Sequence, residues 1–264
     1  MTAAVSDRRS YRDGNSTADR ALTILQMFDE GRPRISASEV ADHLTVSRST
    51  AYRYLQTLVR SEFLAEEPGI GFRLGAKVME LARLARRGYG LSEMAQPIMR
   101  HLAAQFHETV LLTKRIGATI VCLEREEWPG QYVRLSYERG SRLSLNAGAS
   151  AWVLLAWLTD DEVRDLVASE ALQTYTSASL TNPDDILKRL DRIRTDGYSV
   201  ARGELDRDAI GIAAPIFSGD GQVCGGLSIV TLQSRLASET VPEVVQAVVD
   251  SAQHLSREMT TYSD

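Results

Sequence analysis

Residues 47–60, SRSTAYRYLQTLVR, decide the fold of the N-terminal part of the chain. Ala51, Leu55 and Leu58 recur at the spacing of one face of an α-helix, and Ser47 precedes them as a favoured N-cap residue. The stretch contains three arginines and no acidic residue. The pattern predicts a helix that packs by its apolar face and leaves a basic surface toward solvent.

The sequence on either side of this helix indicates a larger unit. Ser36 and Glu39 stand three residues apart, as in a capping box, and predict a helix that ends near Leu44. The turn Thr45-Val46 between the two helices is so short that they must cross steeply, as in a helix-turn-helix. Residues 63–74 predict two short strands around a Pro/Gly turn. We therefore expect a winged helix-turn-helix domain.

This domain carries the side chains that we expect to contact DNA. A recognition helix uses its N-terminal half against base edges, and its first backbone N–H groups favour a phosphate. The expected DNA-binding residues are Arg34, Ser47, Arg48, Ser49, Thr50, Tyr52, Arg53, Tyr54 and Arg73. Surface arginines and hydroxyl caps also occur on helical domains that bind no DNA. The hairpin, the spacing and the acid-free second helix together favour DNA binding.

The distribution of charge agrees with a basic head and an acidic remainder. The chain has a net charge of −5, which is unusual for a DNA-binding protein. Residues 1–90 hold 14 Lys and Arg against 11 Asp and Glu, whereas residues 91–264 hold 16 against 24. Only the part that faces phosphates needs to be basic, and an acidic companion domain reduces indiscriminate adhesion to DNA.

The composition indicates a cytoplasmic protein. No stretch approaches the roughly 18 consecutive apolar residues that a membrane span needs, and the N-terminus lacks the apolar core of a secretory signal. Cys122 and Cys224 are too few and too far apart for a disulfide framework or a Cys-x-x-Cys site, and both lie in apolar runs. We expect both cysteines to be buried core residues.

Four parts follow one another along the chain: a disordered arm at 1–15, the winged helix-turn-helix domain at 16–76, a linker helix at 77–91, and an effector-binding and oligomerisation domain at 92–260. The last part is an α+β domain, in which helices flank a mostly antiparallel sheet. Its helices are expected at 92–106, 146–158, 160–169, 183–196 and 241–259, and its strands at 109–116, 119–124, 132–136, near 200, 210–217 and 223–231.

The sequence contains no pattern that predicts an enzyme, so we expect no catalytic residue, metal or cofactor. The four histidines are scattered, no Gly-rich phosphate loop precedes a helix, and the run 148–152 lacks the final glycine of a nucleophile elbow. The acidic run 203–208 suggests either a cation site or a solvated loop, and we favour the loop. Two alternatives stay open: an enzyme fused to a DNA-binding head, and an architectural DNA binder with a structural dimerisation domain.

The chain resembles the IclR family of bacterial transcriptional regulators over most of its length. The matching pieces are Asp19–Leu25, Ser47–Leu55, Phe72–Gly75, Gly197-Tyr198, Gly211–Phe217 and Gly226–Ile229. The resemblance implies a GAF-like effector domain, a helical linker, and dimers that often pair into tetramers. It also implies binding of palindromic promoter sites and a small organic acid or aromatic compound as effector.

The resemblance further implies which residues line the effector pocket. Carried over by position, these are Asn146, Ala147, Gly148, Ala149, Ala201, Arg202, Gly211, Ser228 and Val230. Members that bind small keto-acids have more polar residues where this chain has Ala201, Gly211 and Val230, so its pocket is expected to take a larger, less polar ligand. Trp128, Tyr132 and Trp152 are expected to stack on a ring, and Arg142 or Arg202 to pair with a carboxylate. We therefore expect a repressor of a catabolic operon that responds to an aromatic acid.

Overall fold

The computed structural model describes residues 17–29, 31–87, 90–130, 137–169 and 172–262. Contacts between residues divide the chain into two units, residues 1–88 and residues 89–264. The expected disordered arm and the expected strand at 132–136 lie outside the described residues. No helix in the described part of the chain is long and apolar enough to cross a membrane.

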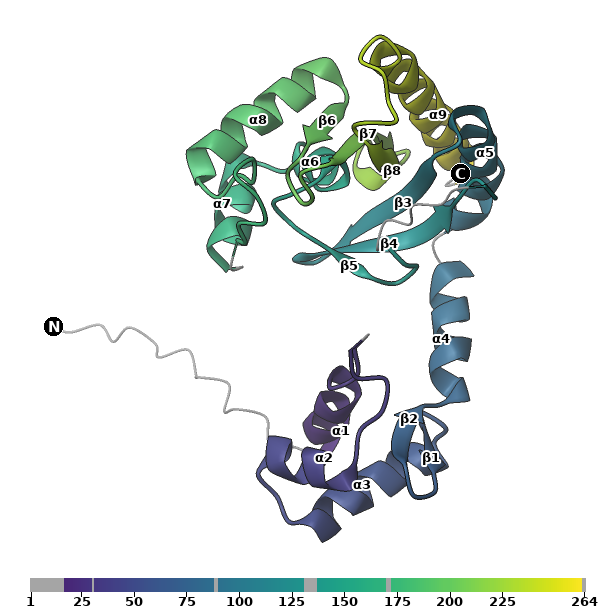
Figure 1. Ribbon diagram of the computed structural model, residues 1–264, viewed down its shortest axis with the longest axis vertical. Coiled ribbons are helices and arrows are strands. Elements are labelled where there is room, and N and C mark those ends of the chain that lie inside the picture. The colour runs from purple at the N-terminus through teal and green to yellow at the C-terminus, as the bar shows by residue number, and fades with distance from the viewer. Residues whose placement is uncertain (1–16, 30, 88–89, 131–136, 170–171, 263–264) are drawn as a thin grey trace, which may run out of the picture. The chain divides into compact units, whose positions relative to one another are not determined.

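The N-terminal unit is the predicted winged helix-turn-helix (Figure 1). Its elements are α1 (Thr17–Gln26), α2 (Ala37–Leu44), α3 (Arg48–Arg60), β1 (Leu64–Glu67), β2 (Gly71–Leu74) and α4 (Ala76–Arg87). The capping box is confirmed, since Ser36 Oγ accepts from the Glu39 N–H at 3.2 Å and the Glu39 carboxylate accepts from the Ser36 N–H at 2.7 Å. Ser47 caps α3 by accepting from the Thr50 N–H at 3.2 Å. These caps satisfy N–H groups that the helices themselves leave unpaired.

One apolar cluster holds this unit together. Ala51, Leu55 and Leu58 of α3 are buried in it, as predicted. The wing strands pair antiparallel, and Ile35 extends the pairing by bonding Phe72 through both backbone groups, at 2.9 and 2.8 Å. A Cβ atom on Gly71 would lie 2.6 Å from the Ile35 carbonyl oxygen, so only glycine permits this close approach.

The C-terminal unit is the predicted α+β domain. Its helices are α5 (Leu91–Phe106), α6 (Ala149–Leu155), α7 (Asp160–Ser169), α8 (Pro183–Asp196) and α9 (Val241–Tyr262). Its strands are β3 (Thr109–Ile116), β4 (Thr119–Glu126), β5 (Arg142–Leu143), β6 (Ser199–Arg202), β7 (Ala209–Phe217) and β8 (Val223–Leu232). The six strands form one sheet in the order β5-β4-β3-β8-β7-β6, and the pairs are antiparallel.

Helices cover both faces of this sheet (Figure 1). On one face α5 and α9 pack on β3, β7 and β8 through residues such as Met99, Leu112 and Val248. On the other face α6 is buried against the sheet, and α7 and α8 pack over it. The buried helix is shorter than expected, because residues 146–148 form a loop that ends at Gly148 with a φ of 92°.

The two cysteines lie in the sheet, as free thiols. Cys122 is buried, in agreement with the prediction, whereas Cys224 is only partly buried. Burial raises the pKa of the Cys122 thiol to about 12 and also raises the pKa of Cys224. Both side chains are therefore protonated at neutral pH.

Candidate functional site

The N-terminal half of α3 presents an exposed, basic surface. The side chains of Arg48, Ser49, Tyr52 and Arg53 are exposed. Between residues that the structure describes, neither Arg48 nor Arg53 forms an ion pair with an acidic side chain. Their guanidinium groups are thus available to an external anion or to base edges.

The hydroxyl groups at the start of α3 bond to one another. Ser47 Oγ lies 3.0 Å from Ser49 Oγ and 2.9 Å from Thr50 Oγ1, in addition to accepting from the Thr50 N–H. Ser47 therefore has a structural task, which is to begin the helix at the correct residue. Ser49 remains exposed, and Thr50 is half-buried.

Tyr54 differs from its expected place on the free surface. It is half-buried, and its hydroxyl accepts a hydrogen bond from Arg20 Nη1 at 2.9 Å. The Arg20 guanidinium carbon lies 5.9 Å from the centre of the Tyr54 ring. Because Tyr54 stands three residues after Ala51 and four before Leu58, it lies beside the buried face of α3 and packs against α1 instead of pointing outward.

Tyr52 lies in a groove between α3 and the wing. Its hydroxyl donates to Glu66 Oε1 at 3.2 Å, and Gln56 Nε2 donates to the other Glu66 oxygen at 2.7 Å. The ring meets the edge of Phe72 at 6.1 Å between centroids. The groove has a volume of about 630 Å³ and also takes in the first residues of α2. Glu66 therefore fixes the recognition helix against the wing.

Arg34 and Arg73, the two expected DNA-binding residues outside α3, both form an ion pair with Glu67. Arg34 Nε lies 2.6 Å from Glu67 Oε2, and Arg73 Nε lies 2.9 Å from Glu67 Oε1. The hydrogen bond from Arg34 is the main cause that lowers the pKa of Glu67, and the same bond raises the pKa of Arg34. Sequence analysis assigned no role to Glu67, because its two arginine partners lie in separate segments of the chain.

A cavity lies in the C-terminal unit between α6, the sheet and the loop after β6. Its volume is about 40 Å³. The lining is formed by Leu111, Tyr137, Leu143, Ser144, Ala147, Gly148, Ala149, Ser150, Ala201, Glu204, Leu205, Ala209, Gly211 and Val230.

Six of the expected effector-binding residues line this cavity, and they are Ala147, Gly148, Ala149, Ala201, Gly211 and Val230. A Cβ atom on Gly211 would lie 3.3 Å from the Ala149 Cβ, so the glycine leaves room beside α6. Ser228 lies next to the lining and shares a buried hydrogen bond with Ser150, at 2.9 Å between hydroxyl oxygens. Asn146 points away and donates to two carbonyl oxygens, those of Gln173 at 2.9 Å and Leu180 at 2.8 Å.

Two of the residues expected to stack on an aromatic effector lie apart from this cavity. Trp152 is fully buried behind the cavity wall, because it lies on the side of α6 that faces α8. Trp128 follows the end of β4, where its ring meets His107 at 4.6 Å between centroids. Neither residue lines the cavity. Tyr132 lies outside the described residues.

The two arginines that were expected to pair with a carboxylate of the effector also lie outside the lining of the cavity. Arg142 lies on the short edge strand β5 and donates to Thr119 Oγ1 on the neighbouring strand. Arg202 ends the opposite edge strand and is exposed, because alternate residues of β6 face opposite sides and Ala201 takes the inward position. Within the described lining, no Lys, Arg or His side chain borders the cavity.

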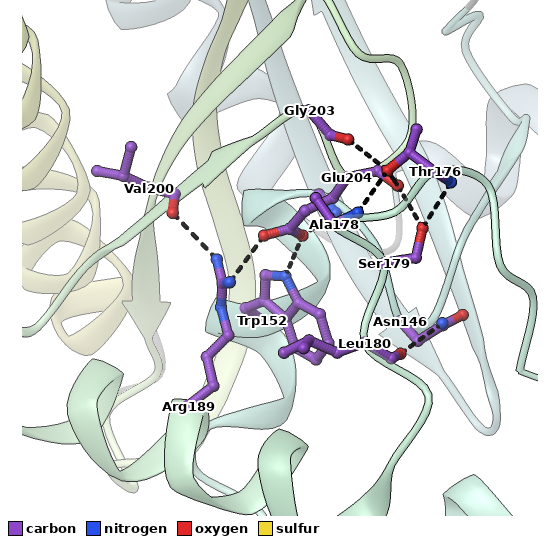
Figure 2. A network of polar contacts seen from close by, with 11 residues as sticks. Asn146, Trp152, Thr176, Ala178, Ser179, Leu180, Arg189, Val200, Gly203 and Glu204 are labelled. Carbon is purple, nitrogen blue, oxygen red and sulfur yellow. Dashed lines mark hydrogen bonds and ion pairs between the residues drawn. The ribbon is translucent and has the colours of Figure 1, made fainter.

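Glu204 is a buried acid in the cavity wall that sequence reasoning placed in a solvated loop. Its side chain is only 3% exposed. One carboxylate oxygen lies 2.7 Å from Arg189 Nη1, and the other accepts from Trp152 Nε1 at 2.6 Å and from the Gly148 N–H at 3.0 Å (Figure 2). The prediction of a solvated loop is wrong for this residue, because its partners lie far away in the sequence.

Arg189 connects Glu204 to the edge of the sheet. Its second Nη atom donates to the Val200 carbonyl oxygen at 3.0 Å, and its guanidinium carbon lies 5.1 Å from the centre of the Trp152 ring. Figure 2 shows the arginine rising from α8 between these partners. The buried carboxylate therefore has a charged partner and neutral donors, as a buried charge requires.

A loop between α7 and α8 fixes the backbone of Glu204 from the other side. Thr176 Oγ1 donates to the Gly203 carbonyl oxygen at 2.5 Å, and Ser179 Oγ donates to the Glu204 carbonyl oxygen at 2.7 Å (Figure 2). The same loop is bound by Asn146, as described above. The part of the wall that contains Glu204 is therefore bonded through both its side chain and its backbone.

The lining as a whole suits a mainly apolar molecule with one or two hydrogen-bonding groups. Its neutral polar groups are the hydroxyls of Tyr137, Ser144 and Ser150. Burial raises the pKa of Tyr137 to about 12, so its phenol stays neutral and can donate a hydrogen bond. Glu204 is paired with Arg189, which leaves the wall without an unpaired charge. In the described ranges, no group of three or more His, Cys, Asp or Glu side chains is arranged to hold a metal ion.

Comparison with known proteins assigns both units to one family. The family model "Bacterial transcriptional regulator IclR C-terminal" matches residues 85–257, and the model "IclR helix-turn-helix domain" matches residues 17–68. The chain is 30% identical to the HTH-type transcriptional regulator KdgR of Escherichia coli over 258 residues, 97% of each chain. It is 28% identical to the HTH-type transcriptional repressor AllR of the same species, over 92% of this chain and 90% of that protein.

A solved structure of a third relative has the same fold. It is an IclR homolog from Microbacterium hydrocarbonoxydans complexed with 4-hydroxybenzoate. The two chains are 25% identical and superpose with a TM-score of 0.80, over 92% of this chain and all of that one.

Proposed function

Because the chain belongs to the IclR family of DNA-binding transcriptional regulators, and is a regulator rather than an enzyme, we propose that it represses a catabolic operon in response to a small aromatic acid. The observation that carries the proposal is the mainly apolar cavity of the C-terminal unit. Two relatives support it: AllR is named a repressor, and the homolog from Microbacterium is complexed with 4-hydroxybenzoate.

The aromatic body of the effector is assigned to the apolar part of the cavity. Leu111, Leu143 and Val230 offer side-chain surface there, and Gly211 leaves space for the ring. The acid group is assigned to the hydroxyls of Tyr137 and Ser150, which line the cavity and can each donate a proton to a carboxylate oxygen. This assignment replaces the expected ion pair with Arg142 or Arg202.

Effector binding must widen the cavity. A volume of about 40 Å³ holds about three water molecules, since one needs roughly 10–15 Å³. An aromatic ring therefore displaces parts of the wall, which gives the bound and free states different structures. Such a difference is what couples ligand binding to DNA affinity, and a coupling of about 1–3 kcal/mol is typical.

The DNA interface is assigned to α3 and the wing. Arg48, Ser49 and Arg53 are exposed on the half of the recognition helix that reads base edges. Arg34 and Arg73 supply contacts to the phosphate backbone.

We further propose that the protein acts as a homodimer on a palindromic operator, with dimers that pair into tetramers. Leu81 and Leu84 of α4 stand three residues apart on one face of the helix and are 42% and 47% exposed, which leaves an apolar surface on a helix of basic character. A second copy of α4 would cover this surface. The helix α4 joins the two units in sequence, so a change in the C-terminal unit can alter the spacing of the paired heads.

Titration calorimetry with two groups of ligands tests the effector. The first group holds 4-hydroxybenzoate, benzoate and phenylacetate, and the second holds pyruvate and glyoxylate. We expect binding from the first group only, because the cavity has lost polar groups. Binding by the keto-acids alone would overturn the assignment.

A gel-shift experiment on the DNA upstream of the protein's own gene tests the regulation. A ligand from the first group should change the affinity for this DNA about 5- to 150-fold. An affinity indifferent to every ligand would favour an architectural DNA binder instead.

A further inference from the structure

Three charged side chains form a cluster where the wing meets the segment before α2. Glu67 binds Arg34 with one carboxylate oxygen and Arg73 with the other, at 2.6 and 2.9 Å. The arginines come from separate segments, since Arg34 precedes α2 and Arg73 lies on β2. One carboxylate therefore joins both segments through its two oxygens.

The backbone brings the two arginines together. Ile35 and Phe72 form an antiparallel bridge, and Arg34 precedes the first while Arg73 follows the second. Antiparallel pairing places residues in these positions opposite each other. Like charges directly opposite repel, so a carboxylate between them is needed to hold both guanidinium groups in this geometry.

Most hydrogen-bond donors of the two arginines stay unused. A guanidinium group has five N–H donors, and Glu67 takes the Nε–H of each. The side chains of Arg34 and Arg73 are 52% and 54% exposed. Between described residues, neither forms another ion pair. Their Nη groups are therefore free to bind an external anion.

We propose that Glu67 is a positioning residue for DNA binding, which holds Arg34 and Arg73 side by side so that both contact phosphates of the DNA backbone. The inference rests on the proposed DNA interface and deepens it. A guanidinium group binds a phosphate best through two parallel hydrogen bonds, which requires a fixed orientation. Side chains that are ordered before binding lose less entropy when they bind.

The role of Glu67 is separable from folding. Exposed ion pairs contribute little to stability, and Glu67 has its side chain 25% exposed at the end of β1. An acid with no positioning role would only weaken DNA binding, because it cancels positive charge near the phosphates. The sign of the effect of removing it therefore distinguishes the two roles.

The test compares Glu67→Gln with the wild-type full-length protein on a labelled random-sequence duplex of about 30 base pairs, because phosphate contacts do not depend on sequence. We expect fluorescence anisotropy to show about three- to tenfold weaker binding at about 50–200 mM salt, although the variant has lost a negative charge. Glu62→Gln is the matched control, since Glu62 is an exposed acid of the same unit. The control should bind as tightly as the wild type or more tightly.

A second background isolates the arginines. In a protein that carries Arg34→Gln and Arg73→Gln, the further change Glu67→Gln should no longer weaken binding. Equal or tighter binding of the single Glu67→Gln variant would overturn the proposal, and so would a loss that persists without the arginines. A wild-type protein that binds neither the random duplex nor its own upstream DNA would instead overturn the DNA interface as a whole, and this inference with it.

Discussion

Each unit of the molecule contains a carboxylate that binds arginine, and the two carboxylates differ in their surroundings. Glu67 in the wing is 25% exposed and binds two arginines that are themselves half exposed. Glu204 in the cavity wall is 3% exposed and binds one arginine together with two neutral donors. Water screens the first group and hardly reaches the second. The same chemistry therefore orients side chains at one site and supports the fold at the other.

The largest effect is expected from breaking the buried pair. Arg189→Met leaves Glu204 without its charged partner, and removal of one member of a buried pair costs about 3–5 kcal/mol. Because Arg189 is 24% exposed, the lower end of that range applies. Urea unfolding of the full-length protein measures it. Arg192→Met on the exposed side of α8 is the control. If Arg189→Met lowers the free energy of unfolding no more than this control does, the buried ion pair does not stabilise the fold.

The next effect concerns the cavity beside that pair. Gly211→Val should reduce effector binding at least about tenfold, because the added atoms fill the space next to Ala149, and overpacking costs about 1–3 kcal/mol of stability. Calorimetry with 4-hydroxybenzoate, benzoate and phenylacetate measures the binding. Ile212→Val is the control, because Ile212 faces α9 on the other side of the sheet. Unimpaired binding by the glycine variant would place the effector elsewhere.

Substitutions in the recognition helix should change the affinity for DNA and leave folding and oligomerisation unchanged. Arg48→Ala and Arg53→Ala should each weaken operator binding about 5- to 100-fold, since a good base contact contributes about 1–3 kcal/mol. Circular dichroism and sedimentation should be unchanged. Arg60→Ala at the far end of α3 is the control. If both arginines can be lost without effect, the placement of the recognition helix is wrong.

The smallest effect is expected from Glu67, the partly exposed carboxylate. Glu67→Gln should leave the urea midpoint unchanged at neutral pH, in contrast to Arg189→Met. The pKa of Glu67 is lowered in the folded protein, so any stability that its charge contributes is present above its unfolded pKa and is lost as pH falls through the folded one. If the urea midpoint of Glu67→Gln falls as far as that of Arg189→Met, Glu67 supports the fold in the same way as Glu204, which contradicts the difference proposed between the two sites.

Local signals in the sequence predicted the helices of the N-terminal unit. Ser36 and Glu39 lie three residues apart, and Ala51, Leu55 and Leu58 follow the helical period, so each signal fits inside one element. The buried helix before residue 158 was also predicted, since it is apolar throughout. The length of this helix was not predicted. The helix starts only after Gly148, whose positive φ of 92° is not visible in the apolar pattern.

Contacts between distant residues could not be predicted in the same way. Tyr54 turns inward because of Arg20, 34 residues earlier, and Trp152 turns toward Glu204, 52 residues later. The residues placed by resemblance to the family fared according to their position. Six of them line the cavity, whereas the side chains of Asn146, Arg202 and Ser228 lie outside its lining. Arg142 and Trp128, which were expected from their residue types alone, have partners that no single-residue pattern contains.

The burial of Cys122 turns it into a reporter of motion. Its side chain packs with Leu111 and Val230, two residues of the cavity wall. Thiols react as thiolates. A pKa of about 12 leaves almost no Cys122 thiolate at neutral pH while the side chain is buried. We therefore expect alkylation of Cys122 to require movement of the residues packed around it, at a rate that follows how often they move apart. A bound effector that holds these residues in one position would change that rate. The alkylation rate of Cys122 would therefore report on motion of the cavity wall.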